Sequence, residues 1–298
     1  MCFAAAKVRF AIMMFGLASL GMADSMPPIW IPAVGNPIAS WNSGIANEGL
    51  ATIYFPSTFV FPLFGETYTS ATVSSNGSIY FGGAPGDSQP LAIVSELLQG
   101  FPRIAPAWYN IEAIDGNGSI LVSMLPGQVV FTWEDVASFV PLPGQSVPPQ
   151  NLATFQVILD GNGTVIFAYQ AFNSLNPLTT GVDNSLVGSP QAIVGITDGY
   201  GASDPGSLDL SSIAKPAGFS YTSASNTIYQ AIDNNPPDNS NLAGLDLIFT
   251  PAADGGWTVT SAYNSDAAPE PATFAEMALS AFVLAAWWRL NAFPIKLC

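Results

Sequence analysis

The feature that most restricts the fold of this chain is a dipeptide, Asn-Gly, that recurs between segments of alternating polar and apolar residues. It occurs at 76–77, 117–118 and 162–163, with strand-like residues on both sides, as in "TSATVSSNGSIYFGG" and "FQVILDGNGTVIFAYQ". Asn-Gly favours the type I′ hairpin turn, in which both central residues take a positive φ. We therefore expect type I′ hairpins and an all-β fold, either an antiparallel β-sandwich or a barrel-like domain.

More strands are predicted where β-branched and aromatic residues gather between turn residues. These segments are 128–136, 192–198, 245–250 and 257–263. Between the strands, the sequence 91–100 favours a short helix of two turns that ends at Gly100. We predict one β domain over 50–263, preceded by a proline-rich lead-in over 24–49.

Charge excludes one class of partner. The chain has 21 Asp plus Glu, 6 Lys plus Arg and a formal net charge of −15, and Arg103 and Lys215 are the only basic residues between 24 and 268. Nucleic-acid binding depends on lysine and arginine contacts with phosphates. We therefore expect no nucleic acid among the partners.

Catalysis has few residues to use. The chain has no histidine, and its two cysteines are Cys2 and Cys298. Ser-His-Asp and Cys-His mechanisms therefore lack their base, and zinc sites lack their commonest ligands. Carboxylate chemistry on a glycosidic bond stays open, with Glu134-Asp135 and Glu112 with Asp115 as candidates by type. We expect a protein that is not an enzyme, with a carboxylate-dependent glycosidase as part of the alternative.

A second pattern, Asp-Gly-Asn-Gly, suggests a calcium site. It places Asp115 two residues before Asn117, and Asp160 two residues before Asn162. Calcium prefers such oxygen ligands, but the same four residues also make tight turns, and neither loop has the acidic residues of an EF-hand. Calcium is the one cofactor that we consider, and the turn interpretation is the stronger.

Aromatic residues offer a candidate ligand surface. Trp108, Tyr109 and Trp133, together with Tyr169, can line a carbohydrate platform if their side chains are exposed. Aromatic residues in alternating strands more often belong to the core. Both interpretations stay open from the sequence.

The amino terminus has the order of a secretory signal peptide. Lys7 and Arg9 precede the apolar run "AIMMFGLASL", and small residues follow. We predict a signal helix within residues 1–23, with cleavage after Ala23. The protein is therefore expected to be exported.

The carboxyl terminus carries an apolar segment at 272–298, after a linker at 264–271. The uninterrupted apolar run between Glu276 and Arg289 has twelve residues. As a helix this run is about 18 Å long, whereas the hydrocarbon core of a bilayer is about 30 Å thick. The linker contains Pro269, Glu270 and Pro271. We predict a hydrophobic helix that is at least transiently in the membrane, with the body outside and Arg289 on the cytoplasmic side.

This end resembles the PEP-CTERM sorting signal of envelope-bearing bacteria, through Pro269-Glu270-Pro271, the apolar helix and the basic Arg289. The resemblance implies an exosortase-type processing enzyme that cuts near the motif. It also implies delivery to the cell surface or the extracellular matrix.

The body resembles the nidogen-like (NIDO) extracellular domain and its bacterial relatives. The resemblance rests on "FPRIAPAWYNI", "VVFTWEDVASF" and three further blocks in a fixed order. The five blocks are 59–83, 101–111, 129–139, 151–170 and 192–201. After Trp108, where relatives carry acidic residues, this chain has Tyr109 and Asn110.

The nidogen-like resemblance implies an extracellular, non-enzymatic module of matrix and adhesion proteins. We expect a bacterial cell-surface protein that acts in adhesion or in extracellular matrix or biofilm structure. Extracellular polysaccharide or matrix proteins are the expected partners, beside the membrane. The alternative is a carbohydrate-binding module or a carboxylate-dependent glycosidase of the cell envelope.

Overall fold

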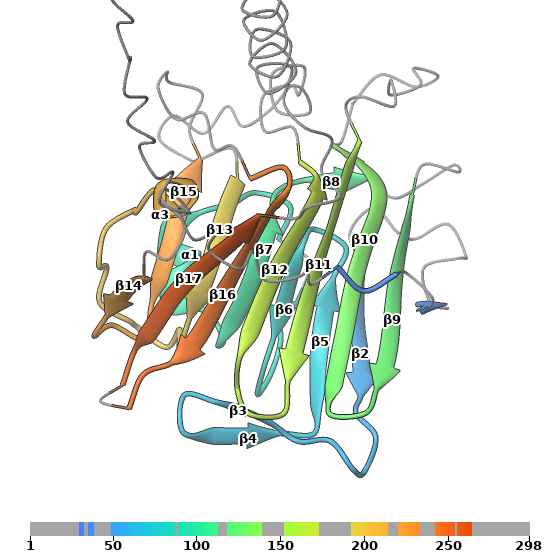
Figure 1. Cartoon of the computed structure of the whole chain (residues 1–298), viewed down its shortest axis with the longest axis horizontal. Coiled ribbons are helices and arrows are strands. Elements are labelled where there is room, and N and C mark those ends of the chain that lie inside the picture. Colours follow the sequence, from blue (N-terminus) through green and yellow to red (C-terminus); the bar gives the residue numbers. More distant parts are fainter. Residues whose placement is uncertain are drawn as a thin grey trace, which may run out of the picture.

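The structure is a computed structural model of the chain. It describes residues 30–32, 35–38, 49–86, 89–112, 118–138, 152–172, 192–213, 220–232, 242–253 and 255–263. All strand pairs in these residues are antiparallel, and the strands form two large sheets that face each other (Figure 1). The fold is therefore the predicted all-β, antiparallel class, in its sandwich form.

The front layer in Figure 1 is a nine-stranded sheet. Its order is β1-β9-β10-β11-β12-β16-β17-β14, and β8 pairs with the far end of β10. Its strands are β1 (Asn36–Pro37), β8 (Ile111–Glu112), β9 (Ser119–Leu125), β10 (Gln128–Ser138), β11 (Ala153–Asp160), β12 (Val165–Ala171), β14 (Ser220–Ser223), β16 (Leu245–Pro251) and β17 (Trp257–Tyr263).

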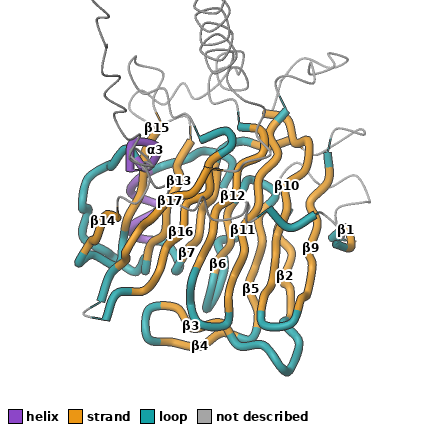
Figure 2. The backbone as a smooth tube through the Cα atoms, in the orientation of Figure 1, coloured by secondary structure: helices purple, strands orange, loops and turns teal. Residues whose placement is uncertain are grey.

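The back layer is a six-stranded sheet in the order β15-β13-β7-β6-β5-β2. Its strands are β2 (Leu50–Tyr54), β5 (Ser70–Ser74), β6 (Ser78–Tyr80), β7 (Arg103–Trp108), β13 (Ala192–Thr197) and β15 (Ile228–Ile232). A separate hairpin of β3 (Phe61–Leu63) and β4 (Glu66–Tyr68) lies at the lower end of the two sheets in Figure 2.

The core fills the space between the two sheets because each strand turns alternate side chains inward. In β10, Val129, Phe131 and Trp133 belong to this core. The Trp133 ring stacks on the Phe155 ring of β11, with centroids 5.1 Å apart and planes 14° from parallel. Burying one such aromatic side chain contributes about 1.5–3 kcal/mol.

A second, smaller core covers the outer face of the six-stranded sheet. Helix α1 (Val94–Gln99) packs Leu97 there against Trp108 and Ile193. The helix ends at Gly100, whose N–H donates to the Glu96 carbonyl at 3.0 Å. The predicted helix over 91–100 is therefore confirmed. The short helix α3 (Leu210–Ile213) belongs instead to the main core, beside β17.

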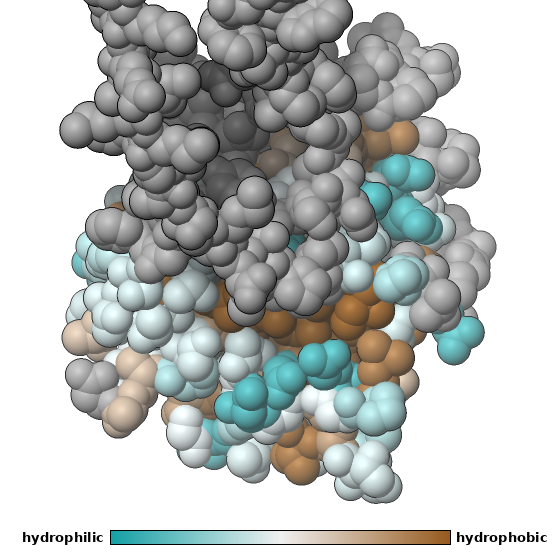
Figure 3. All heavy atoms as spheres, in the orientation of Figure 1, coloured by the Kyte–Doolittle hydropathy of each residue, from teal (hydrophilic) through white to brown (hydrophobic). Residues whose placement is uncertain are grey.

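The outer face of the nine-stranded sheet is partly apolar, and Figure 3 shows a band of apolar side chains across it. The lead-in contacts this face: Ile31 packs on the band, and the Gln156 amide of β11 bonds both the N–H and the C=O of Ile31, at 3.2 and 2.6 Å. The band is one cross-strand row of Val130, Ile158, Ile166 and Ile248. The predicted lead-in thus also contributes to the sandwich.

The Asn-Gly turns at 76–77 and 162–163 join the predicted strands, but the predicted turn type is wrong for both, and Asn117 of the third lies outside the described residues. Gly77 and Gly163 have φ values of 74° and 90°, whereas Asn76 and Asn162 are not among the residues of positive φ. Gly163 N–H donates to the Asp160 carbonyl at 2.9 Å. The hairpin loop therefore has three residues, and only its glycine has a positive φ. A type I′ hairpin instead has a two-residue loop with a positive φ at both residues.

The predicted segments at both termini lie outside the described residues. These are the signal helix with Ala23, the Pro269-Glu270-Pro271 linker, and the hydrophobic helix with Arg289. Within the part of the chain that the structure describes, no helix has the length and apolar character needed to cross a membrane.

Candidate functional site

The three aromatic residues that were predicted as a ligand platform are interior residues. Trp108 and Trp133 are 0% exposed and Tyr109 is 2% exposed. Trp133 and Tyr109 lie in the main core, and Trp108 lies in the core outside the six-stranded sheet. The platform interpretation is therefore corrected: the alternating pattern of their strands places these rings against other strands and not at the surface.

Trp108 has a specific structural partner, the buried Arg103. The Arg103 guanidinium lies over the rings of Trp108 and Tyr80, at 4.1 and 4.6 Å from their centroids. Its Nη2 donates to the Gln89 side-chain oxygen, while its Nε and Nη1 make no hydrogen bond with the described residues. Burial lowers the pKa of Arg103, partly offset by Tyr80 and Glu96. The ring faces therefore stabilise the buried guanidinium, together with the Gln89 bond and the electrostatic attraction of Glu96.

The second Asp-Gly-Asn-Gly segment uses its side-chain oxygens to build a turn. Asp160 Oδ1 accepts from the Asn162 N–H at 3.1 Å, and Asn162 Oδ1 accepts from the Thr164 N–H at 2.8 Å. Asp160 Oδ2 accepts from the Gln128 amide at 3.1 Å. Among the described residues there is no group of three or more Asp, Glu, His or Cys able to hold a metal ion. The other predicted pair, Asp115 and Asn117, lies outside them.

Asp135, one of the candidate carboxylates, shapes a β-bulge. The register between β10 and β11 shifts between Trp133 and Val136, and Asp135 has a φ of 51°. Its N–H donates to Thr154 Oγ1 at 2.9 Å, and the same hydroxyl donates to Asp135 Oδ1 at 3.1 Å. The Asp135 carboxylate therefore has a structural partner of its own.

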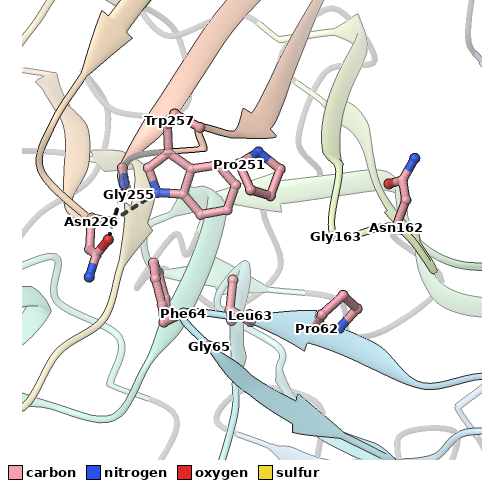
Figure 4. A pocket seen from close by; sticks show the side chains of 12 residues that line it. Pro62, Leu63, Phe64, Gly65, Asn162, Gly163, Asn226, Pro251, Gly255 and Trp257 are labelled. Atoms are coloured by element: carbon pink, nitrogen blue, oxygen red, sulfur yellow. Dashed lines mark hydrogen bonds between the residues drawn. The ribbon is translucent and has the colours of Figure 1, made fainter.

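The described residues form a pocket of about 400 Å³ at one end of the sandwich, shown in Figure 4. Four turns that are distant in sequence meet there. They are the β3–β4 turn, the β11–β12 turn, the β14–β15 turn with Asn226, and the β16–β17 turn. The lining residues are Pro62, Leu63, Phe64, Gly65, Asn162, Gly163, Asn226, Pro251, Ala252, Gly255, Gly256 and Trp257. None of these described side chains ionises, so this lining suits binding of a neutral group.

Phe64 occupies a strained backbone position at this pocket. Phe64 and Gly65 form the two-residue turn between β3 and β4, with φ values of 53° and 84°. The pair of positive φ values that was predicted for Asn-Gly occurs here instead. A positive φ is a genuine outlier for a bulky side chain, and such strain costs on the order of 1–3 kcal/mol.

Trp257 and Asn226 form the opposite wall, and hydrogen bonds fix both. Trp257 Nε1 donates to the Asn226 carbonyl at 2.9 Å, and Gly256 N–H donates to Asn226 Oδ1 at 3.3 Å. The Asn226 amide nitrogen donates to Asp198 Oδ2 at 2.9 Å. Trp257 is 2% exposed and meets the Phe64 ring edge to face, with centroids 5.8 Å apart. Trp257 therefore supports Phe64, whose side chain is only partly buried.

Sequence reasoning missed Phe64, Asn226 and Trp257 as site residues. The β16–β17 hairpin was predicted, and its Gly255-Gly256 pair was a signal for a turn with positive φ, which the structure confirms at 92° and 78°. Nothing local indicates that this turn meets Phe64, because the two are almost two hundred residues apart in the chain.

One comparison with known proteins gives a match. A family model described as NIDO related matches residues 40–251, which include all five blocks of the resemblance to the nidogen-like domain and nearly all of the predicted β domain. Comparison with curated proteins gives no match, and comparison with solved structures gives none.

Proposed function

We propose, on the premise that this chain belongs to the NIDO-related family through residues 40–251, that it is a non-enzymatic binding protein of the bacterial cell surface. The family is of an extracellular type, in keeping with the signal peptide predicted at residues 1–23. The proposal assigns the protein to adhesion or to the structure of the extracellular matrix or biofilm.

The observation that carries the proposal is the pocket between Phe64 and Trp257. Its lining combines rings, prolines, glycines and amides, without a side chain that ionises. Such a lining can hold a ligand but can neither donate nor accept a proton at neutral pH. A binding role therefore fits the pocket better than a hydrolytic one.

Attachment to the surface is the part of the proposal that depends on the carboxyl terminus. Pro269-Glu270-Pro271 and the hydrophobic helix before Arg289 would act as the sorting signal, with an exosortase-type enzyme as the processing partner. The mass of the mature protein from its native host tests this directly. Cleavage near 269–271 is expected, and an intact terminus at Cys298 would leave a simple anchor instead.

Adhesion is tested by deleting the gene for this chain in the native host and measuring the attachment of cells to a surface and to each other. We expect deletion to reduce attachment, and expression of the wild-type chain to restore it. A variant with Pro269→Ala, Glu270→Ala and Pro271→Ala is the matched control for location, because it leaves the β domain unchanged. Attachment that is unaffected by deletion would contradict the proposed function.

A further inference from the structure

We propose that the pocket between Phe64 and Trp257 binds a single uncharged sugar unit, such as the end of an extracellular polysaccharide. The inference rests on the proposed function, since it names the class of ligand that the same pocket takes. Figure 4 shows Trp257 and Pro251 on one side of the pocket, Phe64, Leu63 and Pro62 on the other, and Asn162 at its far end.

The strain at Phe64 is the first indication of a ligand. A left-handed backbone at this turn would suit asparagine or glycine, yet the chain has phenylalanine with a φ of 53°. Backbone strain of this kind gathers at functional sites, where the surrounding structure holds it in place. Here the edge-to-face contact with Trp257 fixes the ring, so that a partly exposed aromatic face borders the pocket.

The walls match the chemistry of a neutral sugar. The C–H faces of a sugar ring pack on aromatic rings and prolines, which this pocket supplies from Phe64, Pro62 and Pro251. The volume of about 400 Å³ lies near the lower end of the range of about 300–1,000 Å³ for small-ligand sites. The pocket therefore suits one sugar unit or the end of a chain.

The polar groups of the pocket supply a hydrogen-bond donor for a hydroxyl. Asn162 is exposed, and its Oδ1 accepts from the Thr164 N–H, which leaves its amide NH₂ without a bond among the described residues. Asn226, in contrast, already uses its Oδ1, its backbone carbonyl and one amide N–H in bonds to Gly256, Trp257 and Asp198. Asn162 is thus the contacting amide, and Asn226 holds the wall in position.

Charged ligands do not fit the same lining. An anionic sugar needs a cation, but the one basic residue in the part of the chain that the structure describes, Arg103, is 0% exposed and enclosed by Tyr80 and Trp108. A cationic sugar needs a carboxylate, and none of the described lining residues supplies one. The pocket therefore selects for neutral sugars through rings and amides alone.

The experiment measures binding of the whole purified chain to single sugars by saturation-transfer NMR and calorimetry. The neutral probes are glucose, galactose, mannose, N-acetylglucosamine and their disaccharides, and the charged probes are glucuronic acid and glucosamine. We expect at least one neutral probe to bind, and the charged probes to bind more weakly. Absence of neutral binding at millimolar concentration, or binding confined to a charged probe, overturns the inference.

Phe64→Asn is the decisive variant. Asparagine tolerates the left-handed region, so the variant keeps the turn while it removes the ring. We expect relief of the backbone strain to offset part of the packing that the ring loses on Trp257, so that the variant folds, and we expect it to bind the sugar about tenfold more weakly or worse. Asn162→Ala should weaken binding about three- to tenfold. Tyr54→Ala removes a 77% exposed ring outside the pocket and should change nothing.

The two proposals fail in different ways. Equal binding by the wild type and by Phe64→Asn overturns this inference, whether or not attachment of cells depends on the chain. Sugar binding that depends on Phe64, combined with unchanged attachment after deletion, supports this inference and contradicts the role in adhesion.

Discussion

Two Asn-Gly turns of this molecule have the same sequence signal but different surroundings. Asn76 is 0% exposed and its Oδ1 accepts from the Ile111 N–H at 2.8 Å, whereas Asn162 is exposed at the pocket. A Cβ on Gly77 would lie 1.9 Å from the Ala107 carbonyl oxygen, and one on Gly163 would lie 3.2 Å from its nearest atom. The turn chemistry is local, but the role of each turn depends on what it contacts.

The two turns also lie at opposite ends of the sandwich. Strand β10 begins at Gln128, which pairs with Asp160 beside the second turn. It ends at Ser138, which pairs with Ile111 beside the first turn. We call the end with the Asn162-Gly163 turn the pocket end, and the end with the Asn76-Gly77 turn the buried end. The difference predicts that substitutions at the buried end change stability, whereas those at the pocket end change binding.

The largest expected effect is that of Gly77→Ala. Its methyl group would overlap the Ala107 carbonyl, and backbone atoms cannot move aside as a flexible side chain can. Overpacking typically costs about 1–3 kcal/mol, and the positive φ adds about 1 kcal/mol, so we expect a loss of about 3 kcal/mol or more in urea unfolding.

Gly127→Ala is the matched control for Gly77→Ala. Gly127 has nearly the same φ, 77° against 74°, and a methyl group added there would have no other atom within 4 Å. The loss of unfolding free energy in Gly127→Ala therefore measures only the cost of a positive φ at alanine, about 1 kcal/mol. Equal losses in the two variants would show that the buried end is not tightly packed around Gly77.

Alkaline pH should destabilise the buried end next. Tyr109 and Tyr169 lie there; burial raises the pKa of both, and the Tyr169 hydroxyl donates to the Pro106 carbonyl at 2.6 Å. Above about pH 10 the unfolded chain releases phenolic protons that the folded chain retains, so stability falls as pH rises. Below that pH the contribution is constant.

The expected slope is about 1.4 kcal/mol per pH unit for each of these tyrosines. Urea unfolding from about pH 8 to about pH 11.5 measures it. Tyr109→Phe should make the slope shallower without loss at neutral pH, because the Tyr109 hydroxyl makes no hydrogen bond with the described residues. A slope unchanged by this substitution would mean that other groups cause the alkaline loss.

Asn76→Ala and Asn162→Ala compare the two asparagines directly. The first substitution leaves the buried Ile111 N–H without its acceptor, which costs about 1–3 kcal/mol. The second removes an exposed bond to the Thr164 N–H that water can replace, so its effect should stay within about 0.5 kcal/mol. Thermal unfolding of both variants at one pH measures the difference. Similar losses would remove the distinction between the two ends.

The sequence predicted those parts of the fold that depend on neighbouring residues. Alternation placed β11 and β12, and Asn-Gly placed the turn between them, because a hairpin needs contacts close in the chain. The same locality explains the errors. Phe64-Gly65 opposes the residue preference of its turn, so no local rule indicates it. The β-bulge at Asp135 likewise has no signal in the neighbouring residues, so the sequence did not predict it.

The candidate site was less predictable than the fold. It forms where four turns converge, and turn signals do not state which turns meet. Trp108 and Trp133 were plausible ligand residues by type. In the structure, the Trp108 ring instead contacts the Arg103 guanidinium, and the Trp133 ring stacks on Phe155. Burial of the single described cation likewise depends on Gln89 and α1, which the sequence around Arg103 does not reveal.

A small expected effect on stability, that of Gly163→Ala, tests whether the pocket end serves binding. Its methyl group would lie 3.2 Å from Pro62 O and 3.3 Å from Pro251 Cγ, tight but without overlap. Gly201→Ala, with a φ of 89° against 90° and open space around it, gives the backbone strain alone. Both variants should lose about 1 kcal/mol of unfolding free energy. Gly163→Ala alone should also weaken sugar binding, because its methyl group stands between two pocket walls. A stability loss as large as that of Gly77→Ala would instead show that this turn, like the first, exists to pack the fold.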